Sequence, residues 1–225
     1  MSEEAKATQE VARATKKAID RLGQMGGWLD RVFGDLVENG VGVVADKIKY
    51  YRIEKALLLR DKVERRLSDK GISATIPVPP RIGVKLIEEA TVADSDELHS
   101  KWANLLTNAM DPKFAGKVTR RFVSILADLE PIDARILDVV VLEYGQLAAN
   151  QRATALFDKT KVSTQLPLLI DECEVALRNL MRLGLIKPGV ITGGVSVGDH
   201  ALGSYKDTEL FAPTLLGVQF HKAVN

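Results

Sequence analysis

The sequence contains one cysteine, Cys173, in 225 residues. A single cysteine excludes an internal disulfide and a Cys-rich zinc site, and it favours a reducing compartment. No apolar run approaches the ~20 residues that a membrane-spanning helix needs. The charged start, MSEEAKATQEVARATKKAIDRL, is neither a signal peptide nor a transit peptide. We therefore expect a cytoplasmic protein.

An excess of charge of either sign is also missing, because 31 basic residues stand against 30 acidic ones. Composition therefore does not indicate nucleic acid or an anionic surface as a partner, and any such patch must be local. A chain of this length can form one large or two small domains and bury roughly 70% of its unfolded surface.

Patterns of known catalytic chemistry are absent as well. No G-x-S-x-G, Walker A loop or paired-acid pattern stands between a credible strand and helix. His99, His200 and His221 have no neighbours at metal-ligand spacing, so we expect surface histidines, and we expect Cys173 to be a small buried side chain. The sequence thus predicts no catalytic residue, no cofactor and no metal, and the protein is not expected to be an enzyme.

The clearest positive feature is a helix within residues 94–112. Asp94 can cap it while Glu97 reaches back, and Pro112 follows its end. One apolar stripe at helical spacing predicts that this helix is central to the core. The structural signature of the chain therefore consists of Asp94, Glu97, Leu98, Trp102, Leu105 and Leu106.

Before this helix, residues 3–22 predict a weakly amphipathic helix that docks late or frays. Residues 23–45 predict two short helical pieces broken near Gly26 and Gly40, since each interior glycine costs about 1 kcal/mol. Trp28 and Phe33 on the apolar face would be the membrane contacts of an interfacial helix. Acidic side chains dominate the polar face, however, and would be repelled by anionic lipid, which favours packing inside the protein.

A long helix is predicted over residues 43–70, ended by Gly71. Residues 47–70 hold nine basic and four acidic side chains, but the charges do not share a face, so a solvated helix is favoured over a phosphate-binding strip. Residues 72–80 contain three prolines and predict an extended link. Further helices are expected over residues 82–91 and 118–129.

The stretch IPVPPRIGVKLIEEATVADSDELHSKWANLLTNAMDP, followed by a helix and then LADLEPIDARIL, resembles the Abi-alpha (abortive infection alpha) family. The resemblance spans most of the chain from about Gly27 onward. It implies a bacterial or prophage helical protein connected with aborting phage infection. The matching residues are packing and capping residues, so the resemblance brings no catalytic residue with it.

From Pro131, at a first helical position, another buried helix begins, and a domain boundary is expected near Glu130. After a loosely patterned segment, residues 145–165, an Asp-x-x-Glu cap at Asp171 and Glu174 predicts a helix that ends before Gly184. Short strands, a Gly-Gly turn at 193 and 194, and a last helix over residues 215–223 follow. This order resembles a winged helix-turn-helix.

Arg178 and Arg182 would be the DNA contacts of such a domain. Together with Asp171 and Glu174, however, they give the exposed face of the helix a net charge of zero. Residues 129–225 hold nine basic and eleven acidic side chains, a net charge of −2, which favours a protein-contact or structural winged helix over a DNA reader.

The sequence therefore predicts a mainly α fold, with an N-terminal helical bundle over residues 1–129 and a winged-helix-like α+β domain with a short β-hairpin over residues 130–225. The resemblance to the Abi-alpha family implies phage defence, so the leading expectation is a non-enzymatic interaction protein of phage defence with a protein partner. A winged-helix DNA-binding regulator and a membrane-perturbing effector acting through residues 22–45 stay open as alternatives. The oligomeric state is left open.

Overall fold

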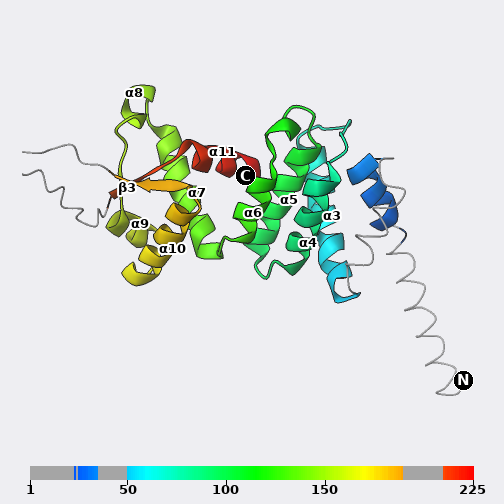
Figure 1. The fold of residues 1–225 in the computed structure, drawn as a ribbon, viewed down its shortest axis with the longest axis horizontal. Helices are drawn as coiled ribbons and strands as arrows, with labels where there is room; N and C mark the ends of the chain where they lie inside the picture. The colour runs from blue at the N-terminus through cyan, green and yellow to red at the C-terminus, as the bar shows by residue number, and fades with distance from the viewer. Residues whose placement is uncertain (1–22, 24, 35–49, 190–209) are drawn as a thin grey trace, which may run out of the picture. The chain divides into compact units, whose positions relative to one another are not determined.

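The computed structural model describes residues 23, 25–34, 50–189 and 210–225, and it is mainly helical with one small antiparallel sheet (Figure 1). The chain divides into two compact units, one of residues up to Ser124 together with Val224, and one of Ile125–Ala223 with Asn225. The predicted helix over residues 3–22, the breaks near Gly40 and the turn at 193 and 194 lie outside the described residues.

The first unit consists of helices. A helix over residues 25–33 is followed by α3 (Tyr50–Asp69), α4 (Pro80–Val92), α5 (Asp96–Met110), the 3-10 helix η2 (Ala115–Lys117) and the start of α6 (Arg120–Ala127). Helices α3, α4 and α5 pack on one another in all three pairings. The prediction of several helices joined by an extended link is confirmed, because residues 73–79 form no helix or strand.

Helix α5 lies at the centre of the first unit. Trp102 is 2% exposed, and Leu98, Leu105 and Leu106 are also buried, as the apolar stripe predicts. The predicted capping box of Asp94 and Glu97 is wrong. Ser95 is the N-cap, and its Oγ accepts a hydrogen bond from the backbone N–H of Leu98 at 3.0 Å. Serine and aspartate cap helices about equally well, so adjacent candidates cannot be separated by type alone.

Two glycines end helices as expected. Gly71 has a φ of +64°, and the backbone N–H of Ile72 donates to the carbonyl of Leu67 at 2.8 Å. Gly184 has a φ of +74°, and the N–H of Leu185 donates to the carbonyl of Leu180 at 2.9 Å. This left-handed cap satisfies carbonyls at a helix end, and glycine adopts it without a Cβ penalty.

The second unit contains α7 (Pro131–Gln146), α8 (Ala149–Arg152), β1 (Phe157–Asp158), α9 (Lys159–Gln165), α10 (Ile170–Arg182), β2 (Ile186–Pro188), β3 (Leu210–Pro213) and α11 (Leu215–Val224). The sheet order is β1-β3-β2 with both pairs antiparallel, and Phe157 faces Phe211 in the register. Helix α10 packs on α7, α9 and β2 (Figure 1). This order of elements is the one that the predicted winged helix requires, and that assignment stays a prediction.

Residues 145–165, which had no clear pattern, contain α8, β1 and α9. Helix α9 starts at Asp158, whose Oδ1 accepts hydrogen bonds from the backbone N–H groups of Thr160 at 2.8 Å and Lys161 at 3.1 Å. Aspartate is a favoured N-cap for this reason. The elements are too short to give a periodic signal, which explains why periodicity did not find them.

Candidate functional site

The outer face of α10 is the first candidate site. Leu169 and Val175 are each 70% exposed, and Ile170 is 41% exposed. Asp171 and Glu172 lie among them in the first turn. Leu169 stands just before the helix and Ile170 opens it, whereas Val175 lies on the second turn, on the outward side that it shares at helical spacing with Asp171. The inner face buries Cys173, Ala176, Leu177 and Leu180.

The start of α10 differs from its prediction. The helix begins at Ile170, and the Glu172 carboxylate accepts a hydrogen bond from the backbone N–H of Leu169 at 3.1 Å. Asp171 lies inside the first turn, so the predicted cap formed by Asp171 and Glu174 is wrong. The chain enters the helix through an apolar residue, and the acid three positions later satisfies its N–H.

Arg178 and Arg182 both face acids of the same unit. Arg178 Nη2 lies 2.7 Å from Glu174 Oε1, and Arg182 Nη2 lies 3.5 Å from Asp128 Oδ2. Hydrogen bonds from Arg178 and then from Lys159 lower the pKa of the Glu174 carboxyl. A phosphate at this helix would have to compete with these carboxylates, although such exposed pairs are weak in themselves.

A buried carboxylate fixes the orientation of α10 against α7. Asp133 Oδ2 accepts hydrogen bonds from Asn179 Nδ2 at 2.6 Å and from the backbone N–H of Glu130 at 2.9 Å. Burial raises the pKa of the Asp133 carboxyl, while these two hydrogen bonds oppose the rise. One side chain therefore caps α7 and positions the helix that carries the exposed apolar residues.

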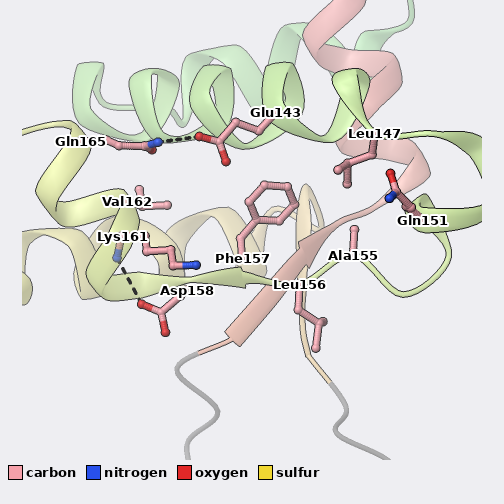
Figure 2. A pocket seen from close by; sticks show the side chains of 10 residues that line it. All are labelled: Glu143, Leu147, Gln151, Ala155, Leu156, Phe157, Asp158, Lys161, Val162 and Gln165. Atoms are coloured by element: carbon pink, nitrogen blue, oxygen red, sulfur yellow. Dashed lines mark hydrogen bonds between the residues drawn. The ribbon is translucent and has the colours of Figure 1, made fainter.

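A pocket of about 380 Å³ is the second candidate site (Figure 2). Figure 2 shows the Phe157 ring rising from β1 between α7 and α9, with Leu147 descending toward it from the end of α7. Val162 contributes a further apolar side chain from α9, and the Glu143 side chain approaches from α7. The lining comes from residues 143–165, where the turn through α8 brings β1 and α9 back against the end of α7. No periodic pattern in this stretch identifies the hollow.

The walls of this pocket are held by hydrogen bonds. Gln165 Nε2 donates to Glu143 Oε1 at 2.6 Å, which joins α9 to α7. Arg152 donates to the carbonyls of Leu147 at 2.9 Å and Gly145 at 2.7 Å, which fixes the corner between α7 and α8. The pocket is therefore formed in advance of any ligand.

Trp28 and Phe33, the proposed membrane contacts, are 5% and 1% exposed. A Cβ on Gly83 would lie 2.5 Å from the Phe33 ring, and the N–H of Val78 donates to the carbonyl of Val32 at 2.7 Å. Gly26 and Gly27 lie inside this helix, so the predicted break near Gly26 is wrong. None of the described helices has the length and apolar character needed to cross a membrane.

Two of the three histidines contradict the expectation of surface positions. His99 is fully buried on α5, with its Nε2 3.2 Å from the carbonyl oxygen of Lys55. Burial lowers the pKa of the His99 imidazole, and the charge of Lys62 lowers it further. His221 is also buried, with its Nε2 3.2 Å from Asp138 Oδ1. His200 lies outside the described residues.

Cys173 is buried, as expected, and desolvation raises the pKa of its thiol, which makes the thiolate less accessible. Within the described parts of the chain, no group of three or more histidines, cysteines and acids could hold a metal ion.

Basic side chains of α3, and Lys70 just after its end, are engaged within the first unit. Lys62 Nζ lies 2.6 Å from Asp96 Oδ1, and Lys70 Nζ donates to Asn108 Oδ1 at 2.8 Å. Arg60 pairs with Asp61 at 2.8 Å. These contacts support a structural role for the helix and not a phosphate-binding strip.

Comparison with known proteins identifies the class of the chain. The sequence model of the family described as "Abortive infection alpha" matches residues 51–224. The match covers well over half of the chain, so the protein belongs to the Abi-alpha family. No curated protein and no solved structure matches it.

Proposed function

We propose that this chain is a non-enzymatic interaction protein of phage defence that binds a protein partner through the outer face of α10. Membership of the abortive infection family supports the defence role. The observation that carries the choice of partner is the exposure of three apolar side chains along the first half of α10, namely Leu169 at its N-cap, Ile170 in its first turn and Val175 in its second. Clustered apolar side chains with a polar rim are typical of protein interfaces. The cytoplasmic location expected from the sequence is part of this proposal.

The acids beside these side chains define the partner further. Asp171 and Glu172 lie within the patch, while Glu174 is already paired with Lys159 and Arg178. A complementary surface would place apolar side chains on Leu169 and Val175 and basic side chains against Asp171 and Glu172, which form no ion pair with any residue that the structure describes. Such charge complementarity contributes mainly to specificity and to the rate of association.

The alternative, a winged-helix DNA-binding regulator, is favoured by the order α7, β1, α9, α10, β2, β3. A DNA-reading helix of this type inserts its N-terminal residues into the major groove. In α10 these residues are Ile170, Asp171 and Glu172. Two carboxylates at the entry to the groove repel the phosphates on either side, whereas specific readers bring arginine, lysine, asparagine or glutamine there.

The third function, a membrane-perturbing effector, loses its main support because Trp28 and Phe33 lie in the core of the first unit. An interfacial helix binds by burying apolar side chains in the lipid, and buried side chains are not available for this.

The test is a phage challenge of a bacterial host that expresses either the unmodified protein or a Leu169→Ser/Val175→Ser variant. Both side chains are 70% exposed, so the variant is expected to fold normally. Leu142→Ser is the matched control, because Leu142 is 58% exposed on α7 and lies outside the α10 face. We expect the double variant to lose protection and partner cross-linking, and the control to keep both.

Two measurements decide between this proposal and its alternatives. A nanomolar, competitor-resistant mobility shift on genomic DNA fragments that is lost in Arg178→Ala/Arg182→Ala would establish the regulator. Flotation of the folded protein with anionic liposomes would favour the membrane effector. Unchanged protection by the Leu169→Ser/Val175→Ser variant would refute the α10 face as the contact surface.

A further inference from the structure

We propose that the pocket between α7, β1 and α9 binds a small zwitterion with an apolar body, of the size of a free aliphatic or aromatic amino acid. The proposal concerns a different surface from α10 and does not depend on the partner contact. A volume of about 380 Å³ falls at the lower end of the range of small-molecule sites. The site therefore suits a compact ligand and not a nucleotide-sized one.

The apolar part of the pocket would hold the side chain of the ligand. Phe157 and Val162 are buried, and Phe157 stacks on Phe211 with ring centroids 6.2 Å apart, so its position is fixed from behind. Leu147 lines the side opposite Phe157 (Figure 2). An apolar group placed between Phe157 and Leu147 would be removed from water on both of its faces.

The negative end of the pocket would hold an ammonium group. Glu143 Oε1 accepts the hydrogen bond from Gln165, and its other oxygen, Oε2, has no donor among the residues that the structure describes. The side chain is half-buried, which limits competition from water. A positively charged donor at Oε2 would form a charge-assisted hydrogen bond, which is stronger than a neutral one.

The positive group is Lys161 of α9. Its backbone N–H is used by the Asp158 cap, but its ammonium forms no hydrogen bond or ion pair with any described residue. Figure 2 shows the side chain extending from α9 toward Phe157. The Glu143 carboxylate and the Lys161 ammonium therefore line the same hollow without pairing with each other. The second carboxylate of the lining, Asp158, has its Oδ1 engaged in the α9 cap, and a zwitterion satisfies both Glu143 and Lys161.

The ligand chemistry can be tested on the unmodified chain by isothermal titration calorimetry with leucine and phenylalanine. A ligand of this size is expected to bind with a Kd of about 10 µM to 1 mM. Three blocked forms of leucine separate the parts of the site. N-acetyl-leucine lacks the ammonium, leucinamide lacks the carboxylate, and N-acetyl-leucinamide lacks both charges. We expect about tenfold or greater loss for each single block.

The residues are tested with Glu143→Gln and Lys161→Gln, each of which keeps the shape of the site. Glu143→Gln should lower the affinity for leucine but not the affinity for N-acetyl-leucinamide, which has no ammonium. Lys161→Gln should lower the affinity for leucine but not the affinity for leucinamide, which has no carboxylate. Lys187→Gln is the matched control, because Lys187 is an exposed lysine of β2 that does not line the pocket. It should bind leucine as the unmodified protein does.

Three results would overturn the proposal. The first is no heat of binding for either amino acid at about 10 mM. The second is equal affinity for leucine and N-acetyl-leucinamide, which would reduce the site to an apolar hollow. The third is unchanged leucine affinity in both Glu143→Gln and Lys161→Gln. The blocked ligands act on the unmodified chain, so the test stands even if a variant fails to fold.

Discussion

Replacing Phe33 by alanine tests whether the helix over residues 25–33 belongs to the core or is available to a membrane. The ring is 1% exposed and lies against Gly83 of α4, where even a Cβ would come within 2.5 Å of it. Truncating a buried phenylalanine costs about 3–5 kcal/mol, and the cost rises where the surroundings cannot collapse. Since helical backbone lines one side of this ring, we expect the upper half of that range.

The assay is urea unfolding followed by tryptophan fluorescence. Trp28 and Trp102 are the two tryptophans of the chain, and both lie in the first unit, so the signal reports on the unit that contains Phe33. We expect a lower midpoint with an unchanged slope, as for a loss of stability without a change in the denatured state. Arg31→Ala is the control on the same helix.

Arg31 forms an exposed ion pair with Glu64 at 2.6 Å. Such pairs contribute about 0–1 kcal/mol, so the control should shift the midpoint little. A loss below about 1 kcal/mol in Phe33→Ala would refute the core assignment. It would do so decisively if the unmodified protein also floated with anionic liposomes and the variant did not.

Four further results are expected. Trp102→Ala should destabilise the first unit by about 3–5 kcal/mol in the same urea assay. A loss of only a few tenths of a kcal/mol in the free energy of unfolding would mean that Trp102 is exposed. Burial lowers the pKa of His99, so as pH falls the unfolded chain binds the proton before the folded chain does. The free energy of unfolding should therefore decline below about pH 6.5, and it should decline less steeply in His99→Gln. Equal pH dependence of the two proteins in urea titrations across pH 5–7 would contradict this. Asp133→Ala should cost about 2–4 kcal/mol, measured by circular dichroism of the second unit, since it removes a cap and leaves Asn179 without its 2.6 Å partner. Gly217→Ala should lower the thermal midpoint, because the new Cβ would lie 2.1 Å from the Leu185 carbonyl oxygen. Gly145→Ala has open space around it and should raise the midpoint slightly, since alanine favours a helix more than glycine does. A rise in both variants would show that α11 does not pack closely on Leu185.

Helix periodicity predicted most of the helices of the fold. The stripe through Leu98, Trp102 and Leu105 identified α5, and the glycines at 71 and 184 identified two helix ends, because both signals depend on residues within a few positions of each other. The capping residue of α5 was misplaced by one position, since Ser95 and Asp94 are equally suited to the role.

Burial of individual polar residues and the pocket depend instead on contacts between different elements. His99 is buried because α5 packs on α3, which brings the Lys55 carbonyl to its ring. The sequence around His99 contains no sign of that neighbour. Glu143, Phe157 and Lys161 likewise meet only because α7, β1 and α9 fold together. The exposed Val175 could have been found, since it lies four positions after Asp171 on the same helical face.

The two acids in the first turn of α10 affect both the stability of this helix and the kind of partner proposed for it. Asp171 and Glu172 lie at the positive end of the helix dipole, and Glu172 also satisfies the N–H of Leu169, so both acids stabilise the helix. The same two carboxylates stand where a DNA-reading helix would approach phosphate. Replacing them with lysine would improve the electrostatics of DNA binding. It would also place positive charge at the positive end of the helix dipole and remove the hydrogen bond to the N–H of Leu169. The features that hold α10 in place are therefore also those on which the proposed choice of a protein partner over nucleic acid rests.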